Sequence, residues 1–112
     1  MNAGSRVVSI AVSQDGKRIV SGTKDGRVTV WNAASRSKII EFKAHFSWVC
    51  AVDVSPDTTK IATGSDDSIA CVWSLSTGER LLSLKHDRMV VAAKFAHDGR
   101  LIATPDLPAK RA

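Results

Sequence analysis

Three residue types that can form a nucleophilic triad occur close together in this chain: an imidazole at His45, a hydroxyl at Thr63 and a carboxylate at Asp67. In a hydrolase such a set would let the base activate the hydroxyl. Trp73, six residues after Asp67, adds an indole N–H that can only donate a hydrogen bond. The same residue types can also form a purely structural polar network, which we favour, and we expect no enzyme activity.

Metal and cofactor chemistry find equally little support. The spacing of the histidines and cysteines matches no zinc pattern, and Cys50 and Cys71 form no C-x-x-C pair. Cys71 is expected on an outward-facing strand position. The glycines fall at turns or strand ends and build no phosphate loop. We therefore predict no cofactor and no metal site. The nitrogen and sulfur side chains that could act as metal ligands are His45, Cys50, Cys71, His86 and His97.

An internal repeat is the strongest feature of the sequence, and it must position these residues. Shifting the chain by 42 residues superimposes Asp25 on Asp67 and Val30-Trp31 on Val72-Trp73. A third copy begins at an offset of 41, where His86 follows His45 and Thr104 follows Thr63. This copy stops after Thr104, and two prolines interrupt the remaining residues. Residues 105–112 are therefore predicted to form an irregular tail.

Short β-branched or alternating segments within each copy, separated by turn residues, indicate strands rather than helices. The expected strands are 7–12, 18–22, 27–31 and 37–42 in the first copy, 48–54, 60–64, 69–73 and 80–84 in the second, and 89–95 and 101–104 in the third.

The second copy resembles a WD repeat. The resemblance rests on His45, Val49, Val52 and the run 54–57 (Val-Ser-Pro-Asp), followed by the run 61–67 (Ile-Ala-Thr-Gly-Ser-Asp-Asp) and by Val72-Trp73. Ser74 and Asn32 stand where the family's name-giving Asp would be. The resemblance implies an all-β partial β-propeller over residues 1–104. It has two four-stranded antiparallel blades (about 7–42 and 48–84) and two strands of a third (89–104).

The family's structural tetrad is carried over in full at His45, Thr63, Asp67 and Trp73, where the side chains are expected to form a hydrogen-bonded chain. Two partial sets remain. The first copy has Ser21, Asp25 and Trp31, with Ala3 at the histidine position, and the third has His86 and Thr104.

The resemblance also implies a binding face for other proteins, next to the first strand of each blade and before the tetrad Asp. Trp48, beside Phe46, is the strongest candidate anchor, although packing against a neighbouring blade would equally explain it. The predicted partner-binding residues are Arg6, Val8, Lys24, Trp48, Cys50, Asp66, Met89 and Val91.

The net charge of +5 leaves a second interpretation open, a basic surface that binds nucleic acid or an acidic partner. The lysines and arginines are scattered, so we rank this alternative below a protein-interaction scaffold. Asp25 and Asp67 are expected to be buried. No apolar run is long enough to span a membrane or to act as a secretory signal, which predicts an intracellular protein, cytoplasmic or nuclear.

Two and a half repeats are fewer than the four to eight blades of a propeller. Three explanations remain open: a fragment of a larger propeller protein, which we favour, self-association, or completion by further blades of another chain. We therefore expect a non-catalytic scaffold that binds other proteins, and expect this role to be a property of a larger propeller.

Overall fold

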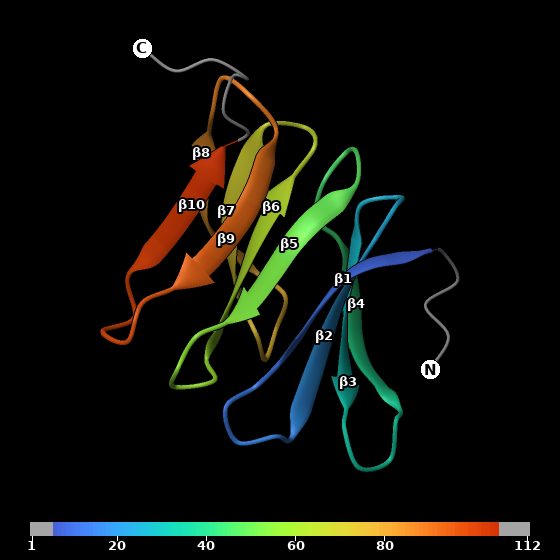
Figure 1. Cartoon of the computed structure of the whole chain (residues 1–112). Helices are drawn as coiled ribbons and strands as arrows, with labels where there is room; N and C mark the ends of the chain where they lie inside the picture. Colours follow the sequence, from blue (N-terminus) through green and yellow to red (C-terminus); the bar gives the residue numbers. More distant parts are fainter. Residues whose placement is uncertain (1–5, 106–112) are drawn as a thin grey trace.

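The computed structural model describes residues 6–105, excluding the side chains of Val91 and residues 101–105. Ala3 and the predicted tail from Asp106 onward lie outside the described residues. Figure 1 shows two sheets side by side, with a pair of strands, β9 and β10, beside the second sheet. The predicted all-β fold class is confirmed, and the described residues contain no helix.

Each sheet is a meander in which every strand pairs with its neighbour in the sequence. All ten predicted strands are present, with ends within one residue of the prediction. Blade 1 contains β1 (Val7–Val12), β2 (Arg18–Thr23), β3 (Arg27–Asn32) and β4 (Lys38–Lys43). Blade 2 contains β5 (Val49–Val54), β6 (Lys60–Ser65), β7 (Ile69–Ser74) and β8 (Arg80–Lys85). The third unit contains only β9 (Val90–Phe95) and β10 (Leu101–Pro105).

A serine and an aspartate close the first hairpin of each complete blade. In blade 2 the Ser55 hydroxyl donates to Asp57 Oδ1 at 2.7 Å, and the Thr59 amide donates to the same oxygen at 3.1 Å. These hydrogen bonds, with that of the Thr59 hydroxyl, lower the pKa of Asp57 to about 2. Ser13 and Asp15 repeat the arrangement in blade 1. The repeated aspartates therefore fix turns, as local side-chain bonding to the backbone predicts.

Two β-bulges recur in both complete blades. The pairing between the first two strands shifts at Val8 in blade 1 and at Cys50 in blade 2. A second shift, between the third and fourth strands, leaves Ile39 and Leu81 without direct partners. A bulge bends its strand and redirects a side chain, so these positions are set by geometry common to the blades.

The core lies between the two blades. Val20, Val28 and Val30 of blade 1 pack against residues of blade 2 that include Ile61 and Trp73. The ring of Phe42 lies 4.8 Å from that of Trp73.

Glycines in the second strands permit this close packing. A Cβ on Gly22 would lie 2.6 Å from Val49 Cγ1, and one on Gly64 would lie 2.6 Å from Val90 Cγ1. These glycines therefore set the spacing between neighbouring blades.

Three expectations from the sequence are wrong. Cys71 is buried, because it shares a sheet face with Trp73, two residues further along the strand, and belongs to the core between the blades. The side chain of Asp25 is 47% exposed and forms an ion pair with Arg27. Pro105 belongs to β10 rather than to the tail, since it pairs with Val90 at the end of an edge strand, where the lack of an N–H is tolerated.

The pairing of β9 with β10 differs by one residue from that of the complete blades. Thr63 pairs with Val52 in blade 2, and the 41-residue offset would pair Thr104 with Ala93. The structure instead pairs Thr104 with Ala92. The connecting turn is tighter, since the Ala96 amide donates to the Arg100 carbonyl, whereas its counterpart Ser55 donates to Lys60.

Candidate interaction surface

The four predicted tetrad residues of blade 2 form a continuous chain of hydrogen bonds. The indole N–H of Trp73 donates to Thr63 Oγ1 at 2.9 Å, and Thr63 Oγ1 lies 2.7 Å from His45 Nε2. On the other side of the ring, His45 Nδ1 lies 3.1 Å from Asp67 Oδ2. This network joins the loop before β5 to β6, β7 and the turn between them.

The donors and acceptors in the network define one protonation state. An ionised Asp67 only accepts, so His45 Nδ1–H donates to it, and a neutral Nε2 accepts from the Thr63 hydroxyl. Burial lowers the pKa of His45 below its ordinary value, although the nearby Asp67 carboxylate acts in the opposite direction. The side chains of His45, Thr63 and Asp67 each have a hydrogen-bond partner within the protein. Thr63 is completely buried and also accepts from Trp73, which supports a structural role for the network.

The other two copies retain only parts of this network. In blade 1, the indole N–H of Trp31 donates to Ser21 Oγ at 2.9 Å. Asp25 instead accepts a hydrogen bond from the hydroxyl of Thr23, which is not part of that pair. In the third unit, the His86 amide donates to the Ser68 carbonyl at 2.7 Å. His86 Nε2 is buried and has no hydrogen-bond partner in the described part of the chain. The side chain of Thr104 lies outside the described side chains.

Several predicted partner-binding residues meet at the end of the blades that also carries the tetrad loops. The ammonium of Lys24 lies 5.4 Å from the centre of the Trp48 ring, a cation–π distance that links blade 1 to the loop before β5. The Asp66 amide donates to the Trp48 carbonyl at 3.1 Å. Trp48 is 40% exposed and Phe46 is 90% exposed. We call Lys24, Phe46, Trp48 and Asp66 the loop-end surface.

Of the remaining predicted partner residues, Cys50 and Arg6 contact residues of this surface. Cys50 is partly buried on the bulge of β5, its thiol lies 3.8 Å from the Trp48 carbonyl, and burial raises the pKa of that thiol. Arg6 is exposed, and its carbonyl accepts from the Lys24 amide at 2.8 Å. Val8 and Met89 are partly buried. The side chain of Val91 lies outside the described side chains.

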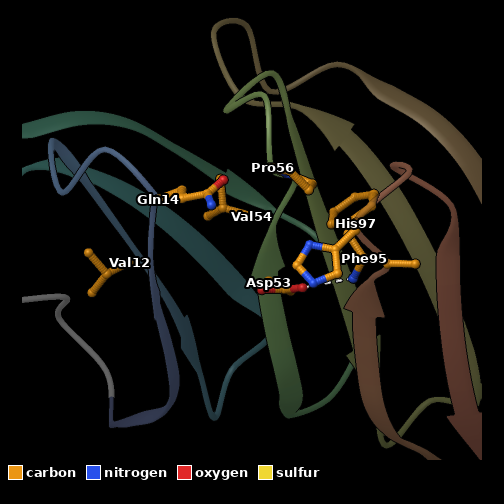
Figure 2. Close-up of a pocket in the computed structure, with 8 residues that line it drawn as sticks. Val12, Gln14, Asp53, Val54, Pro56, Phe95 and His97 are labelled. Atoms are coloured by element: carbon orange, nitrogen blue, oxygen red, sulfur yellow. Dashed lines mark hydrogen bonds between the residues drawn. The ribbon is translucent and has the colours of Figure 1, made fainter.

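The opposite end of the blades carries a groove that the sequence reasoning missed. A cavity of about 370 Å³ lies between the ends of β1, β5 and β9. Figure 2 shows Asp53 and His97 on its wall, with Val12 on the neighbouring strand. We call it the strand-end groove; it is lined by Val12, Gln14, Asp53, Val54, Pro56, Phe95, Ala96 and His97. The signal available in the sequence was Asp53, an acidic residue where the first copy has Ala11.

Within the described part of the chain, no three His, Cys, Asp or Glu side chains come together as metal ligands. The same residues contain no helix long and apolar enough to cross a membrane.

Two segments of the chain, residues 2–32 and 36–74, match the family model described as WD domain, G-beta repeat, and together they cover more than half of the sequence. No curated protein sequence matches the chain.

Among solved structures, the β-propeller domain of Cps50 (Swd1) from Myceliophteria thermophila has a TM-score of 0.86 at 16% identity, over 95% of this chain. The WD40 repeats of RRP9 give 0.77 at 25% identity over 84%, and U3-55K gives 0.74 at 26% over 79%. This chain covers 33%, 29% and 27% of those three chains, respectively. Because the family model covers two consecutive copies and the propeller structures superimpose on the described strands, the chain belongs to the WD-repeat family and has the fold of part of a β-propeller.

Proposed function

We propose that this chain is a non-catalytic WD-repeat scaffold, part of a larger propeller, that binds partner proteins through the loop-end surface. The observation that carries the proposal is the exposure of both Phe46 and Trp48, two residues apart in the loop before β5. Large aromatic side chains are the usual anchors of protein interfaces. The assignment also fits an intracellular protein, since Cys50 and Cys71 are both free thiols.

The contacts of Trp48 support a preformed anchor. Its carbonyl accepts from the Ser65 hydroxyl at 2.7 Å and from the Asp66 amide, and its ring lies beside Lys24. The backbone at Trp48 is therefore held by β6 while much of the ring remains accessible. A preorganised aromatic side chain loses little conformational entropy when it is buried by a partner.

The apolar face of β1 supports the assignment to a larger propeller. Ile10 and Val12 are 59% and 60% exposed, whereas their counterparts one repeat later, Val52 and Val54, are only 7% and 9% exposed because blade 1 covers them. A further blade packed against β1 would cover Ile10 and Val12 in the same way. That blade belongs to the same polypeptide, to another protein or to a second copy of this chain.

Affinity capture with the whole chain tests the scaffold function. Trp48→Ala is expected to reduce partner recovery at least tenfold, the order expected when an interface loses an anchor worth about 2 kcal/mol. The matched control is Ile39→Ala, which removes an exposed apolar side chain on β4 that belongs to neither the loop-end surface nor the strand-end groove, and it should leave recovery unchanged. Quantitative mass spectrometry of the bound proteins gives the readout, and thermal unfolding checks that both variants fold.

Equal recovery with Trp48→Ala and with the unmodified chain would contradict the proposal. Partner binding that is unaffected by Trp48→Ala but is lost as the salt concentration is raised from about 50 to about 200 mM would instead assign the binding function to the scattered basic residues.

A further inference from the structure

The strand-end groove is built by three repeats at once. Its lining residues come from the ends of β1, β5 and β9 and from the turns that follow them: Val12 and Gln14; Asp53, Val54 and Pro56; and Phe95, Ala96 and His97. A second hollow of about 240 Å³ adjoins it and shares Pro56 and His97. The groove therefore depends on the packing of successive blades, and it lies at the end opposite the loop-end surface.

Asp53 is a departure from the repeat. The first copy has Ala11 at this position, and the third has Lys94 at the 41-residue offset, so the strand itself does not require a carboxylate here. Asp53 is partly buried, and its Oδ2 accepts from the Phe95 amide at 2.8 Å, across the interface between two blades (Figure 2). This bond orients the carboxylate on the wall of the groove.

The rest of the wall complements a cationic side chain that has an aliphatic stem. Val12, Val54, Pro56 and Phe95 supply apolar surface beside the carboxylate of Asp53. Within the described residues, neither the groove nor the adjoining hollow is lined by a lysine or an arginine, although the chain carries 16 of them. An arginine or lysine can bury its methylene groups on apolar surface while its charge remains at the rim.

We propose that the strand-end groove is a second binding site, which takes an arginine or lysine side chain of a partner polypeptide. The charged head bonds to Asp53, and the methylene stem lies along Val54, Pro56 and Phe95. A charge-assisted hydrogen bond to a carboxylate already held by Phe95 favours a basic segment over a neutral one of the same shape. The site is independent of the loop-end surface, so the scaffold function does not depend on it.

The probe for the site is the capped pentapeptide Ac-Gly-Val-Arg-Val-Gly-NH2, titrated into the isotope-labelled whole chain and followed by amide chemical shifts. We expect shifts that saturate and that cluster at residues 12–14, 53–57 and 95–99. The same peptide with citrulline in place of arginine has the same shape without the charge. It should bind about tenfold more weakly, the change expected from replacing a charge-assisted hydrogen bond by a neutral one.

Two variants test the role of the groove. Asp53→Asn keeps an oxygen that can accept from the Phe95 amide but removes the charge, and it should weaken arginine-peptide binding about tenfold. Gln14→Lys changes an exposed residue of the same wall, places a cation beside the site without touching the Asp53 bond, and should weaken binding as well. Asp66→Asn makes the same charge change at the loop-end surface and should leave peptide binding unaltered.

The proposal is overturned if the peptide shifts no amides of the groove. It is equally overturned if the arginine and citrulline peptides bind alike, or if Gln14→Lys and Asp53→Asn both bind as the unmodified chain does. Shifts confined to residues 24, 46–48 and 66 would assign the peptide to the loop-end surface and reject the groove.

Discussion

At the scale of single residues, His45 shows how a polar group is accommodated in the core. Its ring is almost completely buried, with Thr63 on one nitrogen and Asp67 on the other. Protonation of Nε2 would turn that atom into a second donor toward Thr63, whose oxygen already accepts from Trp73, and the hydroxyl proton would lose its partner. The network is therefore complete only while the imidazole is neutral.

His45→Gln should lower the free energy of unfolding by about 1–3 kcal/mol at pH 8, because it breaks a buried network and leaves polar partners unsatisfied. Urea unfolding followed by tryptophan fluorescence gives the measurement. His97→Ala is the matched control, since that histidine is exposed, and its unfolding free energy should stay within about 0.5 kcal/mol of the unmodified chain. A similar loss in both variants would contradict the structural role of His45.

The same side chain gives stability a defined pH dependence. The pKa of His45 is lowered in the folded state, so the unfolded chain takes up a proton first as the pH falls through about 6.5. The contribution of His45 is therefore fully present above that pH and declines between the unfolded and the lower folded pKa. The difference in unfolding free energy between the unmodified chain and His45→Gln should shrink from pH 8 to pH 5. A constant difference would show that His45 does not titrate in this way.

At the scale of strands, glycines determine how closely one sheet approaches the next. Gly22 lies in β2 opposite the side chain of Val49 at the start of β5, and the Ser9 hydroxyl donates to the Val49 carbonyl at 2.8 Å nearby. Gly64 and Val90 repeat the contact one interface later. A side chain at either glycine would separate two strands that the core requires to be in contact.

Gly22→Ala should lower the free energy of unfolding by about 1–3 kcal/mol, the cost of overpacking a closely packed interior. Val49→Ala removes Cγ1, which would lie 2.6 Å from the new methyl group, although Ser9 Oγ and Val49 Cβ would remain at 2.5 and 2.8 Å. The double variant should therefore recover part of the loss and be less destabilised than the sum of the two single variants. A double-mutant cycle measured by urea unfolding gives this coupling. Strict additivity would place the strain somewhere other than the contact between β2 and β5.

The sequence predicted the strands well because the information that specifies them is local. The β-branched runs and the Ser-Asp turns lie within single hairpins, and the 42-residue repeat marks the same hairpins in both complete blades. The prediction failed where the answer depends on which sheet face meets another blade. Cys71 is such a case, since its burial follows from packing between the blades. Asp25 lies in the turn between β2 and β3, where it is half exposed and pairs with Arg27 two residues along the chain.

The two candidate surfaces also differ in how well the sequence predicts them. The residues of the loop-end surface could be chosen from their places in the repeat, and the structure brings Lys24 and Trp48 together. The strand-end groove joins residues about 40 positions apart from three copies, so no local pattern marks it. The one-residue shift between β9 and β10 is likewise invisible in an alignment of the copies, because it arises from a tighter turn at Ala96.

At the scale of the whole molecule, blades 1 and 2 pack together through two apolar surfaces, one from each blade. The equivalents of both surfaces are exposed on the outer faces of the chain. Ile10 and Val12 are the exposed counterparts of buried Val52 and Val54. On β8, Leu82 and Leu84 are exposed, whereas their counterparts Ile40 and Phe42 pack against the core. Complementary faces on one molecule favour head-to-tail association.

We expect the isolated 112-residue chain to associate as its concentration rises, and Ile10→Lys to reduce that association by placing a charge on the exposed face. Size-exclusion chromatography with light scattering measures both. Val52→Lys is the comparison, since it places the same charge on the buried counterpart and should unfold the chain. A monomeric unmodified chain at all concentrations, or unchanged association of Ile10→Lys, would contradict this expectation.

The meander order of the strands has a consequence for how the protein is made. Because every strand pairs with the one just before it, each hairpin closes over a short stretch of chain, and the entropic cost of loop closure stays small. Blade 1 contains every strand of its own sheet, so its internal hydrogen bonds require no residue of blade 2. Each later blade then folds against a surface that is already in place, so synthesis and folding advance along the chain in the same direction.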